Sequence, residues 1–71
     1  MDKLSSVDPA SKGQRYARIF RKAGTLLGKG DITRAAAILT EGRELAEALG
    51  DRAMARRFAD EISRVTASGA S

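Results

Sequence analysis

The fold is decided by residues 22–51, which read KAGTLLGKGDITRAAAILTEGRELAEALGD. This stretch contains two helix stops, GKGD at residues 28–31 and GD at residues 50–51. Glycine supplies the backbone freedom that a turn or a left-handed helix end needs, and aspartate caps the helix that follows. The stretch therefore predicts one helix between the two stops, with a second helix before it and a third after it.

All three predicted helices are amphipathic. Before the first stop, apolar side chains recur at steps of three and four residues, which is the period of one helix face. They are Tyr16, Ile19, Phe20, Ala23, Leu26 and Leu27. In the middle helix, apolar residues and Gly42 cover roughly half of the helical wheel, so this helix should contact two neighbours. The third helix carries Met54, Phe58, Ile62 and Val65 on one face. The pattern predicts an all-α fold: an antiparallel helical hairpin plus a third helix.

Local signals also predict where the domain begins and ends. The Asp8-Pro9 pair is typical of a helix start, because Asp caps the first turn and Pro fits the first helical position. After Val65 the residues are small and polar, with nothing to bury. We expect a flexible arm over residues 1–8, a three-helix domain over residues 9–66 and a flexible tail over residues 67–71.

The composition limits how such a small domain can be stabilised. The chain has 71 residues and contains neither Cys nor His, which excludes disulfides and thiolate or imidazole metal sites. Below roughly 70 to 80 residues, a single core seldom supplies more than a few kcal/mol. A homo-oligomer or a protein partner is therefore expected to add burial. No segment has the length of a membrane span or the apolar core of a signal peptide, so we expect a cytoplasmic protein.

The charges alternate in sign along the chain. Residues 12–30 carry six bases and no acid, residues 31–51 carry five acids and two bases, and residues 52–71 carry four bases and two acids. Arg15, Arg18, Lys22 and Lys29 fall within about 60° of one another on the helical wheel. Such a row is usually a solvated face, but it also suits an acidic protein surface or the phosphates of nucleic acid or lipid.

The sequence offers no catalytic or cofactor-binding constellation. Without His or Cys, and with no evident base beside any Ser or Thr, neither nucleophilic nor acid–base catalysis is indicated. Residues 24–30 approach a phosphate-binding loop, but the spacing is one residue short and no strand precedes it. We interpret this segment as a helix corner, and we expect neither an enzyme nor a cofactor.

Several positions together resemble a tetratricopeptide repeat. They are Ala23 and Leu26 in the first helix, Gly30 and Asp31 at the corner, Ala35, Leu39 and Gly42 in the second helix, and the closing Leu49-Gly50-Asp51. The last three are typical of a longer bacterial form of the repeat. The resemblance covers one repeat plus the opening helix of a second. It implies protein binding, with Ala17, Phe20, Gly24 and Leu27 on the inner surface that contacts a peptide or helix.

We therefore expect a small adaptor or regulator that binds a partner protein. Phe20, Leu27 and Phe58 are the predicted apolar contacts. Arg15, Arg18 and Lys22 are predicted to steer a partner that is acidic or presents an apolar helix.

The alternative is a DNA-binding regulator. Residues 44–50 also resemble the first half of a helix-turn-helix, and a basic helix follows. In that case Arg52, Arg56 and Arg57 would contact phosphates or base edges.

Overall fold

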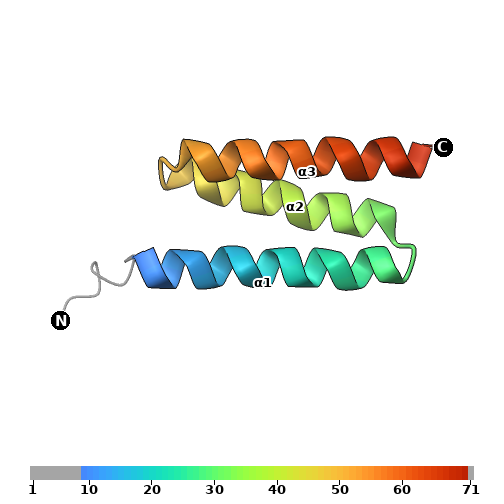
Figure 1. Cartoon of the computed structure of the whole chain (residues 1–71), viewed down its shortest axis with the longest axis horizontal. Helices are drawn as coiled ribbons and strands as arrows, with labels where there is room; N and C mark the ends of the chain where they lie inside the picture. The colour runs from blue at the N-terminus through green and yellow to red at the C-terminus, as the bar shows by residue number, and fades with distance from the viewer. Residues whose placement is uncertain (1–8, 71) are drawn as a thin grey trace.

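The chain forms three helices, α1 (Pro9–Gly28), α2 (Ile32–Ala48) and α3 (Arg52–Ala70), as Figure 1 shows. This computed structural model describes residues 9–70, and their side chains from residue 11 to residue 67. Helices α1 and α3 run in the same direction and α2 runs in the opposite one (Figure 1). There is no strand within residues 9–70. The predicted all-α fold, a helical hairpin plus a third helix, is confirmed.

The helical part of the chain begins at Pro9 and ends at Ala70. Helix α1 begins at Pro9, as expected, and the predicted arm over residues 1–8 lies outside the described residues. Helix α3 continues to Ala70, beyond the predicted domain end at residue 66. The prediction placed the end at the last apolar residue. Ala is a good helix former whatever its burial, so the absence of large apolar residues does not require the helix to end at residue 66.

Both corners are built in the same way. Gly30 and Gly50 adopt left-handed φ angles of 81° and 73°. A residue with a Cβ would be strained there, so glycine is favoured. Asp31 and Asp51 follow, and each accepts a hydrogen bond of 3.2 Å from the backbone N–H three residues further on. The helix stops and caps that the sequence predicts are confirmed.

The core is centred on Phe58, whose side chain is completely buried. Its ring meets Tyr16 edge to face, with 5.7 Å between centroids, and stacks on Phe20 at 4.5 Å. On α2, Gly42 leaves room for the same ring: a Cβ at this position would lie 2.6 Å from Phe58 Cζ. Helices α1, α2 and α3 therefore meet at one aromatic ring.

Helix α2 packs against both of its neighbours, as its broad apolar face predicts. Its buried residues are Ala35, Leu39, Gly42 and Ala46. Around this core lies a larger set of apolar side chains that are only partly buried: Ile19, Phe20, Leu27, Ile32, Ile38, Leu45, Leu49, Met54, Ala55 and Ile62. Two helices can cover only part of each other, so three helices leave apolar edges that face solvent.

Candidate functional site

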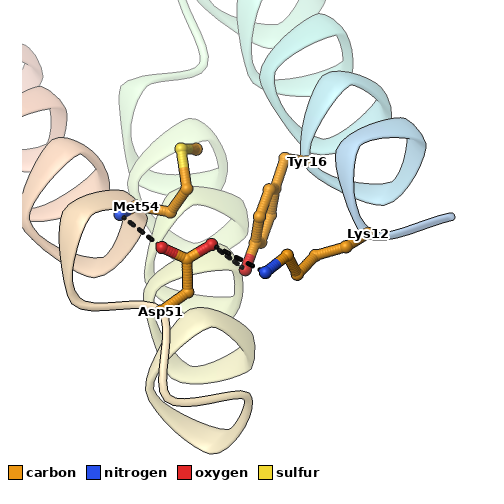
Figure 2. Close-up of polar contacts among 4 residues, drawn as sticks. All are labelled: Lys12, Tyr16, Asp51 and Met54. Atoms are coloured by element: carbon orange, nitrogen blue, oxygen red, sulfur yellow. Dashed lines mark hydrogen bonds and ion pairs between the residues drawn. The ribbon is translucent and has the colours of Figure 1, made fainter. Parts of the chain in front are cut away.

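A cluster of polar side chains ties the start of α1 to the corner between α2 and α3 (Figure 2). Asp51 Oδ2 accepts a hydrogen bond of 3.2 Å from the Tyr16 hydroxyl and lies 3.4 Å from Lys12 Nζ. Asp51 Oδ1 accepts the backbone N–H of Met54 at 3.2 Å. The two carboxylate oxygens of Asp51 thus hold three partners from two helices. This arrangement is a structural connection between distant parts of the chain.

The Asp51 cluster shifts the ionisation of its two acidic members. The hydrogen bond from the Met54 backbone N–H, together with Lys12 and Tyr16, lowers the pKa of Asp51 despite the opposing effect of burial. The pKa of Tyr16 is raised by burial and by the nearby charge and hydrogen bonding of Asp51. Both shifts favour a charged Asp51 carboxylate and a neutral Tyr16 phenol.

We expect the protein to lose stability in acid as the Asp51 carboxylate becomes protonated. Because its folded pKa is lowered, the carboxylate stabilises the fold above its unfolded pKa of about 4. This stabilisation is lost as the pH falls from about 5 through the folded pKa. Thermal unfolding followed by circular dichroism from pH 7 to pH 2 should show a smaller fall in Tm for Asp51→Asn than for the unchanged chain. Asp31→Asn, at the other cap, is the matched control. Equal acid sensitivity in the unchanged chain and in Asp51→Asn would contradict this role.

Two of the three predicted apolar contact residues, Phe20 and Leu27, are half-buried on the side of α1 that faces α3. Phe58 is different, because it is 0 % exposed and forms the centre of the core. A partner cannot touch Phe58 in this structure, so its predicted contact role is corrected to a core role. The sequence places both rings on apolar stripes and does not reveal which ring lies deeper.

Leu27 borders a hollow of about 270 Å³. Leu27, Ile32 and Val65 form its apolar lining, and Glu61 and Arg64 form the polar part. We use the name α1–α3 groove for this hollow together with the neighbouring pair Phe20 and Arg57, so that it comprises Phe20, Leu27, Ile32, Val65 and the rim residues Arg57, Glu61 and Arg64.

The rim of the α1–α3 groove belongs to α3 and is mainly basic. The guanidinium carbon of Arg57 lies 5.5 Å from the centre of the Phe20 ring, within the range of a cation–π contact. One turn further, Glu61 is paired with Arg64. Glu61 and Arg64 were not selected from the sequence, and Arg57 was selected only as a nucleic-acid contact of the DNA-binding alternative. Their spacing of four and three residues on α3 was the available signal, since it places them on one side of the helix.

The α1 side of the groove is open because its exposed residues are small. Ala17 and Gly24 are both exposed, and a Cβ added at Gly24 would meet nothing within 4 Å. A side chain from another molecule can therefore approach the backbone of α1 here.

The predicted steering bases do not join this groove. We call Arg15, Arg18 and Lys22 the basic row, and all three are exposed. Phe20 lies two residues from both Arg18 and Lys22, which places it about 160° away from each around the helix. The single contact surface expected from the sequence is therefore divided into two surfaces on opposite sides of α1. The two-residue spacing in the sequence is sufficient to predict that Phe20 lies on the opposite side of α1 from Arg18 and Lys22.

The residues of the DNA-binding alternative are exposed on α3, but they are not equivalent. Arg57 covers Phe20, whereas Arg52 and Arg56 lie on other sides of the helix. Helices α2 and α3 lie side by side and antiparallel (Figure 1), whereas a helix-turn-helix sets its two helices about 90–120° apart. The packing therefore adds no support to this alternative.

No protein-family model, curated protein or solved structure matches this chain. Among the described residues, no helix combines the length and the apolar character that a membrane crossing requires. Within the same residues, no group of three or more acidic side chains is placed to hold a metal ion.

Proposed function

We propose that this chain is a small, non-enzymatic adaptor or regulator of the cytoplasm that binds a helical segment of a partner protein in the α1–α3 groove. The observation that carries the proposal is the hollow of about 270 Å³, whose apolar lining is Leu27, Ile32 and Val65, with the half-buried Phe20 seven residues before Leu27 on the same helix. A concave apolar surface with a few polar groups at its edge is typical of a site that receives the apolar face of an amphipathic helix.

The rim supports an acidic partner. Arg57 and Arg64 contribute two positive charges and Glu61 one negative charge, so the rim is net positive. Arg57 is exposed and makes no ion pair among the described residues, so its guanidinium can donate hydrogen bonds to a carboxylate while it stays over Phe20. We infer a partner helix with a large apolar side chain for the hollow and an acidic residue about two turns away for Arg57.

The resemblance to a tetratricopeptide repeat supports the same location. That resemblance assigns an inner, ligand-contacting surface to Ala17, Phe20, Gly24 and Leu27, and these residues form the α1 side of the groove. Gly24 and Ala17 keep the approach to the backbone open, and Phe20 and Leu27 offer the apolar area.

The experiment combines cross-linking in cells with a blocking variant. A photoreactive amino acid at Gly24 should cross-link one protein, while the same group at Ser63, which is exposed on α3 away from the groove rim, should not. We expect Gly24→Glu to weaken binding of that purified partner at least about tenfold, because it fills the groove with a charge that repels an acidic ligand. Ser63→Glu is the matched control, and calorimetry gives both affinities.

Gly24→Glu is a strict test because it leaves the core unchanged. Position 24 is exposed and helical, so the folded state accepts Glu without steric conflict. If the partner bound Gly24→Glu as tightly as the unchanged chain, or cross-linked equally from positions 24 and 63, the groove would not be the binding site.

A further inference from the structure

We propose that the opposite side of α1 is a dimer interface, where α1 of one copy packs against α2 of a second copy. This interface uses the basic row and an apolar strip beside it. It is separate from the α1–α3 groove, so the proposal does not rest on the proposed function.

The apolar strip lies between α1 and α2, on the side away from α3. Its members are Ile19 and Leu26 from α1 and Ile38, Leu45 and Leu49 from α2, all of them only partly buried. Phe20 and Leu27 face α3, and Ile19 and Leu26 each precede one of them by one residue, which turns them about 100° away. On α2, the strip residues form the edge of the buried face that borders α1.

Charges of opposite sign flank this strip. The basic row lies on its α1 edge, and Glu41 lies on its α2 edge, with Glu44 on the next turn. The ion pairs that the structure contains use other residues: Lys12 with Asp51, Arg34 with Asp31, Arg43 with Glu47, and Arg64 with Glu61. Within the described side chains, the basic row, Glu41 and Glu44 make no ion pair. The basic row and the two glutamates can therefore form ion pairs with a second molecule.

The charges select one of two symmetric ways of stacking two hairpins. A twofold axis perpendicular to the helices would place α1 against α1 and bring basic row against basic row. A twofold axis parallel to the helices places α1 of each copy against α2 of the other. This rotation leaves every residue at the same height along the helix axes. Because α1 and α2 form an antiparallel hairpin, Arg18 and Lys22 of one copy then lie above and below the height of Glu41 of the other copy. The second arrangement pairs opposite charges twice, because a twofold interface repeats every contact.

The size of this face indicates a weak dimer. Two adjacent helices about 25 Å long present a face of roughly 500 Å². This is below the roughly 800 Å² per partner of a standard interface. Burial of the apolar strip favours association, and the paired charges set its geometry. We expect a dimer that dissociates on dilution and weakens in high salt.

The test is a charge exchange between two variants, read as mass by light scattering from about 1 µM to 1 mM protein. The first variant is Arg18→Glu with Lys22→Glu, and the second is Glu41→Lys with Glu44→Lys. Each variant alone would face like charges across the interface, so its dimer Kd should rise at least about 100-fold. An equimolar mixture should restore the dimer mass, because a mixed pair has opposite charges at both contacts. Native mass spectrometry should identify that species as the mixed pair.

Three controls make the result decisive. The four substitutions combined in one chain should restore a homodimer, because both contacts of that dimer again pair opposite charges. Arg56→Glu and Asp60→Lys on α3 are matched charge changes away from the interface and should leave the dimer mass unchanged. Gly24→Glu should leave it unchanged as well, which separates this proposal from the groove. A monomer at every concentration, two variants that stay dimeric alone, or a mixture that stays monomeric would each overturn the proposal.

Discussion

Phe58→Ala is expected to leave the chain largely unfolded at 37 °C. The ring is fully buried, and it contacts Tyr16 and Phe20 of α1 and lies against Gly42 of α2. Truncating such a ring costs about 3–5 kcal/mol, through lost burial and the cavity left behind. A single core in a chain of this size seldom supplies more than about 3–5 kcal/mol in total. The loss is therefore comparable to the whole stability of the domain.

Circular dichroism at 222 nm with urea titration measures this effect. Phe20→Ala is the matched control, because it removes the same ring from a half-buried position on the edge of the core. It should destabilise the protein by clearly less than Phe58→Ala does. If the two variants unfolded at the same urea concentration, Phe58 would not be the centre of the core, and the correction of its role from binding to packing would be wrong.

The elements of the fold could be predicted because their signals are local. Gly30 and Gly50 are followed at once by Asp31 and Asp51, and each pair ends one helix and caps the next within a few residues. The 3.6-residue apolar period is equally local. Such rules require only neighbouring residues, so the three helices and their order follow from the sequence.

The contacts between distant residues could not be predicted in the same way. The hydrogen bond from Tyr16 to Asp51 joins positions 35 residues apart, and no local pattern connects them. The different depths of Phe20 and Phe58 have a similar cause. Both rings lie on an apolar stripe, and the burial of Phe58 depends on Gly42 of another helix.

The division of the candidate site was within reach of the sequence. Arg18 and Phe20 are two positions apart, and side chains two positions apart in a helix point to nearly opposite sides. The single contact surface predicted from the sequence therefore combined basic residues from one side of α1 with apolar residues from the other side. The hollow itself was not predictable, because Leu27, Ile32 and Val65 come from three different helices.

Gly42→Ala and Gly24→Ala are expected to change stability in opposite directions. Both glycines lie inside helices, where the change to Ala alone stabilises by roughly 0.5–1 kcal/mol. At Gly24 a Cβ would meet nothing within 4 Å, so this gain should appear in full. At Gly42 a Cβ would lie 2.6 and 2.8 Å from two carbons of the Phe58 ring, well inside contact distance. The ring cannot move aside freely, because Phe20 and Tyr16 hold it.

Overpacking of a core costs about 1–3 kcal/mol, which exceeds the gain in helix propensity, so Gly42→Ala should be net destabilising by about 1–2 kcal/mol. Urea unfolding of the two variants beside the unchanged chain gives both values. Adding Phe58→Leu to Gly42→Ala should cost less than the sum of the two separate changes, because a smaller side chain leaves room for the new methyl group. Stabilisation by Gly42→Ala equal to that of Gly24→Ala would show that α2 and α3 do not approach closely at this position. A sub-additive double variant would instead locate the close contact at this glycine and this ring.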